Sequence, residues 1–316
     1  MKILANDGLA KSGINALETA GFEVITDTVA QERLVEYINE NKVTGLLVRS
    51  ATKVRKDIID SCSSLKLIGR GGVGMDNIDV DYACEKGLHV INTPGASSAS
   101  VAELVFAHLF GMVRFLFDAN RNMPLEGDTR FKELKKSYSA GIELRGKKIG
   151  IIGFGRIGRE VAKIAIGQGM EVLAHDTHCK AADIELDFYD GQKINFNIKT
   201  VSIEEIYENA DFITVHVPHQ GKALISKTEI EMMKDNVGLI NAARGGVIDE
   251  SDLLDALESG KVRFAGLDVF VNEPTPNMKV LMTHQISMSP HIGAATLEAQ
   301  DRIGTELAEQ IESLLK

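Results

Sequence analysis

KIGIIGFGRIGRE, residues 148–160, joins a short apolar run to a helix-like segment through three closely spaced glycines. We expect a strand, a tight turn and the start of a helix. Gly153 lets the turn close, Gly155 lets a pyrophosphate approach because it has no Cβ, and Gly158 lets the helix pack close to the strand. The helix N-terminus adds unpaired N–H groups and a partial positive charge, which favour an anion. The stretch therefore predicts a dinucleotide-binding turn.

A second strand follows this turn and ends near an acidic residue. GMEVLAHD, residues 169–176, places Asp176 23 positions after Gly153, close to the roughly 20 positions expected for a ribose-binding acid. A carboxylate there accepts hydrogen bonds from ribose hydroxyls and repels a 2′-phosphate, which favours NAD over NADP. Lys180 weakens that preference. The alternative is a solvated charge at a strand end, but the upstream glycines favour the cofactor role.

Length, charge and cysteine usage narrow the class of protein. The 316 residues are enough for two domains, and a net charge of −10 disfavours non-specific nucleic-acid binding. No apolar run reaches the length of a membrane span, and the first residues turn polar too soon for a signal peptide. We therefore expect a cytoplasmic protein without nucleic-acid or membrane partners. Three cysteines without metal-ligand spacing predict free thiols and no metal site.

Short apolar runs alternate with helical patterns in two successive parts of the chain. In the first part the predicted strands are 2–5, 22–25, 45–48, 67–70 and 89–92, and the predicted helices are 12–20 and 31–41. The second part begins with an apolar helix over 98–116; its predicted strands are 149–152, 171–174, 212–216, 238–241, 264–268 and 286–289, and its later helices are 204–209, 251–260 and 297–315. Such alternation predicts parallel sheets flanked by helices.

This order predicts an α/β protein with two doubly wound parallel-sheet domains. We expect a Rossmann-type cofactor domain and a flavodoxin-like substrate domain, with the ligand in a cleft between them. If the final helix packs on the first series, the substrate domain is discontinuous. Two segments resist assignment: residues 120–144 lack a clear period, and residues 179–200 form an insertion in which only 193–198 alternates like a strand.

NAARGG, residues 241–246, follows an apolar strand directly and places Arg244 at the carboxyl end of that strand. A planar guanidinium there can bind a carboxylate through two hydrogen bonds. The alternative is a surface arginine on a glycine turn. The two glycines beside it suggest that another group approaches closely, which favours the ligand role.

Two further segments place ionisable groups after strands. DVFVNEP, residues 268–274, carries Glu273 before a proline that keeps it extended, and SPHIGA, residues 289–294, carries His291. A carboxylate that contacts a histidine fixes its tautomer and stabilises its protonated form, as acid–base catalysis requires. A lone histidine is more often structural or simply exposed. The pairing of Glu273 with His291, 18 positions apart, depends on tertiary structure.

In order and spacing, these segments resemble the D-isomer-specific 2-hydroxyacid dehydrogenase family over essentially the whole chain. The resemblance implies NAD-dependent hydride transfer, with Arg244, Glu273 and His291 as the catalytic trio. It also implies that residues 1–97 and 290–316 form the substrate domain and residues 98–289 the cofactor domain. The implied cofactor-binding residues are Gly153, Gly155, Arg156, Ile157, Gly158, Asp176, His216, Val217, Pro218, Ala242, Ala243, Arg244, Asp268, His291, Gly293 and Ala294.

Within the family, two loops of the first domain resemble those of the phosphoglycerate dehydrogenases. These loops are VRSATKV, residues 48–54, and IGRGGVGMDN, residues 68–77. The implied substrate-binding residues are Arg49, Ser50, Arg70, Gly71 and Gly72. Arg49 and Arg70 would supply positive charge for a carboxylate or phosphate. The alternative is a pair of exposed arginines at strand ends, and the sequence leaves both open.

The resemblance implies oxidation of D-3-phosphoglycerate to 3-phosphohydroxypyruvate, the first step of serine biosynthesis. Neutral His291 would take the hydroxyl proton while hydride leaves C2, and Glu273 would stabilise the imidazolium. Two departures from the family pattern concern the exact substrate and not the reaction type: Ser97 stands where an asparagine is usual, and Val73 where a threonine is common. Because the sequence stops at Lys316, directly after the last family helix, we do not expect feedback control through an appended serine-sensing domain.

Two other functions fit the same pattern. One is reduction of glyoxylate, hydroxypyruvate or a longer 2-oxo acid by the same machinery. The other, of a different class, is an NADH-sensing corepressor that binds peptide motifs; the phosphoglycerate-like loops and the absence of disordered flanks disfavour it. Family members usually dimerise through the cofactor domain, and the apolar helix over 98–116 is compatible with a homodimer.

Overall fold

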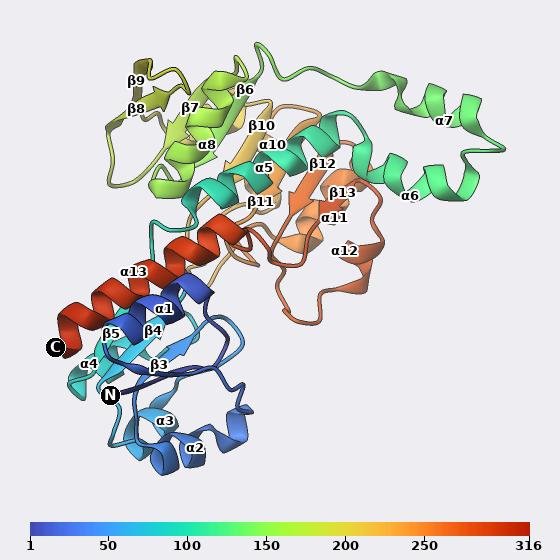
Figure 1. The fold of residues 1–316 in the computed structure, drawn as a ribbon. Coiled ribbons are helices and arrows are strands. Elements are labelled where there is room, and N and C mark those ends of the chain that lie inside the picture. Colours follow the sequence, from blue (N-terminus) through green and yellow to red (C-terminus); the bar gives the residue numbers. More distant parts are fainter. The chain divides into compact units, whose positions relative to one another are not determined.

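The computed structural model describes residues 1–316 and divides them into two compact units (Figure 1). Unit 1 comprises Met1–Ser100 and Ala294–Lys316, and unit 2 comprises Val101–Gly293. These boundaries lie a few residues after the expected ones at 97/98 and 289/290. The last segment of the chain therefore returns to the N-terminal unit.

Unit 1 contains a parallel sheet with the strand order β2-β1-β3-β4-β5, which is the flavodoxin-like order. Its strands are β1 (Lys2–Ala5), β2 (Glu23–Ile25), β3 (Val43–Val48), β4 (Leu67–Arg70) and β5 (His89–Asn92). Its helices are α1 (Lys11–Thr19), α2 (Leu34–Asn41), α3 (Lys56–Ser61), α4 (Val80–Glu85) and α13 (Leu297–Leu315), and a 3-10 turn covers Gln31–Arg33.

Helices cover both faces of the sheet in unit 1. Buried side chains of α2, α3 and α4 pack on one face, and those of α1 and α13 pack on the other. The α1–α13 contact depends on two glycines, because a Cβ on Gly13 would lie 2.6 Å from the Cα of Gly304. The final helix therefore packs in the same unit as the first series of strands.

Unit 2 contains a parallel sheet with the order β13-β12-β11-β10-β6-β7 and a separate β8-β9 hairpin. Its strands are β6 (Lys148–Ile152), β7 (Glu171–His175), β8 (Ala181–Asp187), β9 (Lys193–Lys199), β10 (Phe212–Val215), β11 (Val237–Asn241), β12 (Val262–Leu267) and β13 (Ile286–Met288). Its helices are α5 (Ser98–Val113), α6 (Leu116–Glu126), α7 (Phe131–Ser137), α8 (Arg156–Gly167), α9 (Ile203–Asn209), α10 (Lys227–Met232), α11 (Glu250–Ser259) and α12 (Met278–Met282), with a 3-10 turn at Tyr138–Ala140. The two parallel sheets confirm the predicted α/β class.

The layers of unit 2 place its loops for ligand binding. Buried side chains of α5 and α8 pack on one face of the sheet, and those of α9 to α12 pack on the other. All strands are parallel, but β7 is added on one side of β6 and β10 to β13 on the other, so the strand order reverses between the neighbours β6 and β10. Open parallel sheets bind ligands at such a switch point, outside the carboxyl ends of the strands.

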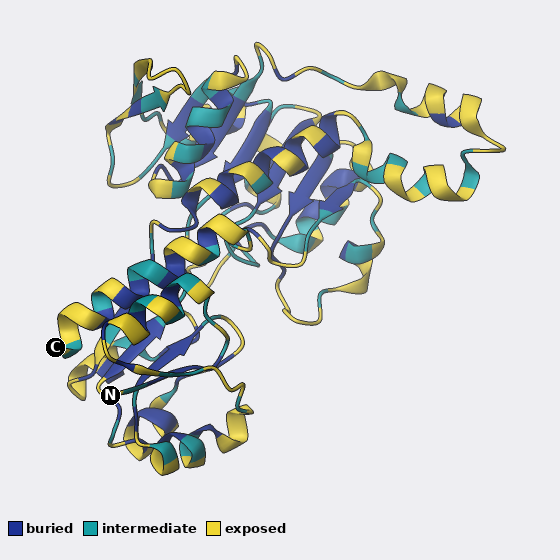
Figure 2. Cartoon of the chain, in the orientation of Figure 1, coloured by how far each residue is buried: buried dark blue, intermediate teal, exposed yellow.

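Two segments that lacked a clear pattern are structured. Residues 120–144 fall largely in α6 and α7, which form a helical hairpin projecting from the sheet (Figure 1). Most of this hairpin is exposed (Figure 2), so no apolar face had to recur with a helical period. Residues 179–200 form the antiparallel β8-β9 hairpin, in which both strands and not only 193–198 are extended.

The apolar helix predicted over 98–116 ends earlier, at Val113. Phe115 adopts a left-handed backbone conformation, with φ of 56°, which separates α5 from α6. No single helix is long and apolar enough to cross a membrane, although α5 and α6, bent by 57°, meet the limits of length and composition together. The three cysteines are free thiols, as predicted.

Candidate active site

The glycine turn after β6 has the geometry that its sequence predicted. Gly153 has φ of 97°, and a Cβ there would lie 2.5 Å from the His216 carbonyl oxygen at the end of β10. A Cβ on Gly158 would overlap the Gly153 carbonyl, so α8 packs tightly against the turn. Gly155, the N-cap of α8, faces open space. The turn therefore exposes the helix N-terminus, with Arg156 as its first helical residue.

Asp176 follows β7 and holds the same turn from the neighbouring strand. Its Oδ2 accepts the N–H of Phe154 at 2.8 Å, and its Oδ1 accepts the N–H groups of His178 and Cys179 at 2.8 and 3.0 Å. Partial burial acts to raise the pKa of Asp176, but these backbone hydrogen bonds outweigh it and hold the pKa below its ordinary value. An ionised carboxylate at this position fits the predicted ribose contact.

His216, Val217 and Pro218 follow β10 at the switch point. Nε2 of His216 lies 3.0 Å from the Thr214 hydroxyl, whereas its buried Nδ1 has no partner. Burial lowers the pKa of His216 to about 4, so the imidazole is neutral at physiological pH. An unpartnered buried nitrogen beside the glycine turn is a position where a bound ligand can supply the missing hydrogen bond.

Arg244 lies in the loop after β11, as the sequence predicted. Asn241 holds this loop: its Nδ2 donates to the Arg244 carbonyl at 2.8 Å, and its Oδ1 accepts the N–H of Ala243 at 3.0 Å. Nη1 of Arg244 donates to the Ala243 carbonyl at 2.7 Å. Ala242, Ala243 and Arg244 are all partly exposed. Nη1 of the guanidinium is thus held against its own loop.

The glycines after Arg244 have a different purpose from the one inferred from sequence. A Cβ on Gly245 would overlap the Phe270 carbonyl, so the group that approaches closely is the chain's own loop after β12 and not a ligand. Gly246 has φ of 80° and faces the His219 ring. The absence of a side chain at Gly245 lets the loop after β12, which carries Glu273, pack against the loop of Arg244.

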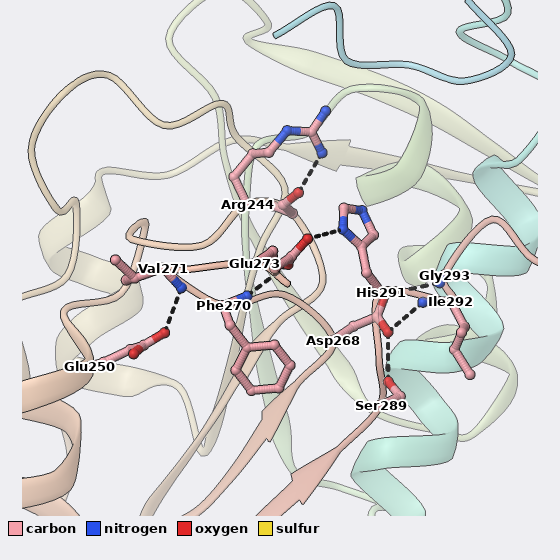
Figure 3. Close-up of polar contacts among 11 residues, drawn as sticks. Arg244, Glu250, Asp268, Phe270, Val271, Glu273, Ser289, His291, Ile292 and Gly293 are labelled. Carbon is pink, nitrogen blue, oxygen red and sulfur yellow. Dashed lines mark hydrogen bonds and ion pairs between the residues drawn. The ribbon is translucent and has the colours of Figure 1, made fainter. Parts of the chain in front are cut away.

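Glu273 and His291 form a hydrogen-bonded pair (Figure 3). His291 Nδ1 lies 2.7 Å from Glu273 Oε2, and the two side chains are 40% and 36% exposed. The other carboxylate oxygen accepts the N–H of Phe270 at 2.9 Å, which fixes the acid. Because a carboxylate accepts, Nδ1 donates, and Nε2 of the neutral ring is left as an acceptor. The structure therefore brings together the acid and imidazole that the sequence left unpaired.

Asp268 fixes the turn that contains His291. Its backbone carbonyl accepts the N–H of His291 at 2.8 Å, and its carboxylate accepts the N–H groups of Ile292 and Gly293 at 2.8 and 2.9 Å (Figure 3). Asp268 is 1% exposed, so it acts here as a buried anchor for the loop. Ala294, the last predicted cofactor-binding residue, already belongs to unit 1.

The predicted substrate residues lie at the carboxyl ends of β3 and β4 in unit 1. Asp7 accepts the backbone N–H of Arg49 at 2.6 Å, and Asn77 donates to the Arg49 carbonyl at 2.8 Å while accepting from Nε of Arg70 at 2.9 Å. Arg49 lines a hollow at the switch point between β1 and β3, and Ser50 is exposed beside it. Asp7 and Asn77 were missed as site residues; their polar side chains next to strand ends were the available signal.

Gly71 and Gly72, two of the implied substrate-binding residues, have backbone N–H groups that are already hydrogen-bonded. The N–H of Gly71 donates to the Val48 carbonyl and that of Gly72 to the Arg70 carbonyl, both at 2.9 Å. These two donors are used within unit 1, so a substrate carboxylate would have to use the later amides of the loop. Gly72 has φ of 154°, and a Cβ there would lie 2.7 Å from Nη1 of Arg70.

The fold and the site define a class of protein. A dinucleotide turn with an acid after the second strand, at the same sheet edge as a carboxylate–imidazole pair, is the arrangement of a nicotinamide-dependent oxidoreductase. The chain belongs to the D-isomer specific 2-hydroxyacid dehydrogenase family, because residues 106–293 match the model of the family's NAD-binding domain. Unit 2 is therefore the NAD-binding domain. The open space at Gly155, the carboxylate of Asp176 and the unpartnered Nδ1 of His216 fit that cofactor.

Relatives cover the whole chain. It is 41% identical to a D-3-phosphoglycerate dehydrogenase of Methanocaldococcus jannaschii, over 100% of this chain and 58% of that protein. It is also 41% identical to a hydroxypyruvate reductase of Thermotoga maritima, over 98% of this chain and 97% of that protein. The crystal structure of a glyoxylate reductase from Paecilomyes thermophila matches with a TM-score of 0.82 and 29% identity, over 100% of this chain and 95% of that one. The chain thus spans little more than half of the first relative and nearly all of the other two.

Proposed function

We propose that this protein oxidises D-3-phosphoglycerate to 3-phosphohydroxypyruvate with NAD. The observation that carries the reaction type is the 2.7 Å contact between His291 Nδ1 and Glu273 Oε2, which leaves Nε2 ready to accept a proton. Support for this substrate comes from the D-3-phosphoglycerate dehydrogenase relatives, which match over the whole chain at 36–41% identity.

The side chains of unit 2 divide the chemistry between them. Neutral His291 accepts the proton of the C2 hydroxyl at Nε2, and Glu273 stabilises the imidazolium that forms. Arg244 binds the substrate carboxylate and the C2 oxygen, where a planar guanidinium offers two parallel donors. Bound NAD supplies the acceptor for the hydride from C2. General base catalysis of this kind contributes about 10²–10⁴-fold to the rate.

Arg49 is the residue of unit 1 that we assign to the phosphate. Its hydrogen bonds to Asp7 and Asn77 are made by its backbone, so its guanidinium remains available for a ligand. Arg70 is held by Asn77 and adds a second positive charge to the same loop cluster. A doubly anionic substrate would use both charges, whereas a simple 2-oxo acid needs fewer.

Reduction of hydroxypyruvate or glyoxylate is the second candidate. It is favoured by the hydroxypyruvate reductase of Thermotoga maritima, which matches this chain over nearly its full length. The two candidates share the roles of His291, Glu273 and Arg244 and differ in what Arg49 must bind. The phosphate contact is therefore the property that separates them.

A substrate panel with one matched pair of variants tests this proposal. Rates with 3-phosphoglycerate, glycerate, hydroxypyruvate and glyoxylate are measured by nicotinamide absorbance, with NAD(H) and with NADP(H). We expect the highest kcat/KM for 3-phosphoglycerate with NAD. Arg49→Gln should raise KM for 3-phosphoglycerate by at least about tenfold, the equivalent of one lost charge-assisted hydrogen bond, and change KM for glycerate much less.

The control for this test is Arg55→Gln, because Arg55 lies on the same unit but is paired with Asp79 at 2.8 Å. Its KM values should match those of the wild type. Higher kcat/KM for hydroxypyruvate than for the phosphorylated pair, with no substrate-dependent effect of Arg49→Gln, would assign the protein to the second candidate.

We also propose that the protein forms a homodimer through unit 2. The α6-α7 hairpin exposes Leu116, Met123, Leu125 and Phe131, which are 55%, 41%, 77% and 56% exposed. Several exposed large apolar side chains on one projecting hairpin favour a protein–protein contact. A second copy is the partner that the family resemblance favours, because members usually pair through this domain.

A further inference from the structure

A buried histidine on α5 belongs to a hydrogen-bonded chain that reaches the turn of His291. His108 is 5% exposed in a mostly apolar helix. Its Nδ1 lies 2.8 Å from the Ser287 hydroxyl, and its Nε2 lies 2.9 Å from the Ser289 hydroxyl. Ser289 in turn donates to Oδ1 of Asp268 at 2.6 Å (Figure 3). All of these residues belong to unit 2.

The direction of each hydrogen bond follows from the proton inventory. Ser289 has one hydroxyl proton and gives it to Asp268, so it must accept from the Nε2–H of His108. Nδ1 of the same neutral ring then accepts the hydroxyl proton of Ser287. Burial lowers the pKa of His108, against the opposing charge of Asp268, and so keeps the ring neutral. One tautomer of His108 satisfies every group in the chain.

The end of this chain is a backbone conformation that needs support. His291 has φ of 55°, in the left-handed region that non-glycine residues rarely adopt. Such a conformation is strained and persists only where the surrounding structure holds it in place. Asp268 holds this conformation in place, because it accepts three hydrogen bonds from the backbone N–H groups of residues 291–293. If the Asp268 carboxylate can move, the turn that carries His291 can therefore move with it.

The sheet is shaped to admit the imidazole of His108. Gly266 in β12 faces it, and a Cβ at Gly266 would lie 2.9 Å from the His108 Cβ. A buried polar ring is costly unless it is fully hydrogen-bonded, and a fully satisfied network holds its members rigidly. Ser287 and Ser289 provide these hydrogen bonds, and Ser289 also donates to Asp268, which fixes the turn of His291.

We propose that His108 is a positioning residue for the dehydrogenase reaction. Acting through Ser289, it fixes the Asp268 carboxylate and thereby holds His291 where its Nδ1 meets Glu273. The inference rests on the proposed function, since it takes His291 as the general base. It assigns to α5 a role in catalysis through a buried side chain whose two ring nitrogens contact Ser287 and Ser289.

The test uses two amides of different length at one position. Glutamine at position 108 places its amide nitrogen near the former Nε2 and can still donate to Ser289, whereas the shorter asparagine places it near Nδ1. We expect His108→Asn to lower kcat by about tenfold or more, the scale of a small misplacement of a catalytic group, with NADH affinity unchanged. His108→Gln should restore most of kcat. Hydrogen exchange of residues 291–293 should accelerate only in His108→Asn.

A double variant shows whether His108 acts through Ser289. If it does, His108→Asn with Ser289→Ala loses no more kcat than Ser289→Ala alone, because contacting residues of one network are not additive. Multiplied losses, or wild-type kcat and exchange in His108→Asn, would overturn the proposal. If His108→Asn does not fold, near-normal kcat in His108→Gln and reduced kcat in Ser289→Ala decide in its favour, and the reverse decides against it. A wild-type protein that oxidises no 2-hydroxy acid refutes the proposed function, while the exchange rates still test the network.

Discussion

At the scale of the residue, the site depends on which atoms of Glu273 and His291 are already occupied. Both oxygens of Glu273 have partners, one on the Phe270 N–H and one on the imidazole. The acid therefore has one orientation, and the ring it holds has one tautomer. A nearby acid, Glu250, has a similar backbone contact, since its Oε1 accepts the N–H of Val271 at 2.8 Å (Figure 3). Glu250 does not contact the imidazole, so it can serve as a matched control for Glu273.

Replacing Glu273 should therefore affect turnover much more than replacing Glu250. Glu273→Gln keeps an acceptor for Phe270 but removes the charge that stabilises the imidazolium, and we expect kcat to fall by about 10²-fold. Glu250→Gln should leave kcat near that of the wild type. Steady-state rates of both variants at saturating NAD check this, and equal losses would show that Glu273 only shapes its loop.

At the scale of the element, two hairpins flank the sheet of unit 2 and differ in how much of their surface is buried. The β8-β9 hairpin packs Ile184, which is 1% exposed, into the core that α5 and α8 share. The α6-α7 hairpin buries little of its own surface (Figure 2). The first is thus part of the folded domain, whereas the second is available to a partner.

The β8-β9 hairpin should contribute to the stability of unit 2. Ile184→Ala leaves a cavity in a packed core and should reduce the free energy of unfolding by about 2–4 kcal/mol. The control is Ile194→Ala on the partner strand, where the side chain is 46% exposed; it should change the free energy by no more than about 0.5 kcal/mol. Urea titration followed by circular dichroism measures both, and equal stabilities would show that the hairpin does not share the core.

The α6-α7 hairpin should carry the dimer contact. Leu125→Asp puts a charge on a side chain that is 77% exposed and should convert a dimer to a monomer, because a buried unpaired charge opposes association. Leu297→Asp is the control, since Leu297 is 82% exposed but lies on α13 in unit 1. Sedimentation velocity gives the masses. A monomeric wild type, or a dimer that survives in Leu125→Asp, contradicts this assignment.

At the scale of the whole molecule, neutral histidines inside unit 2 make its stability depend on pH. Burial lowers the pKa of His216 from 6.5 to about 4 and also lowers that of His108. Below pH 6.5 the unfolded chain binds protons that the folded chain does not. The free energy of unfolding is therefore at its full value above pH 6.5 and falls as the pH drops toward 4.

We expect that loss to reach roughly 2–3 kcal/mol for His216 between pH 6.5 and 4 in the cofactor-free protein. His216→Gln should flatten the dependence, because the amide does not titrate. His284→Gln, at an exposed position of the same unit, is the control variant. Denaturant titrations at several pH values give the slopes, and a steep slope that survives in His216→Gln would show that another group controls the acid side.

Much of the architecture could be predicted from the sequence, because its signals are local. The glycines at 153, 155 and 158 impose a turn and close packing wherever they occur, and buried parallel strands appear as short apolar runs. The order of these runs then fixes the α/β class. Segments 120–144 and 179–200 were missed because α6 and α7 have no continuous buried face and because β8 lies in a hairpin whose strands are half exposed.

The sequence alone determined the dinucleotide turn, the acid after the second strand and the residue types available for acid–base chemistry. Only the tertiary structure decided that Glu273 contacts His291, that Gly245 faces Phe270 and that His108 reaches Ser289. The physical reason is the distance along the chain over which each interaction acts. Turn geometry and strand burial are set by neighbours along the chain, whereas a hydrogen bond between residues 18 or 181 positions apart exists only when the packed sheet aligns the ends of separate strands and helices.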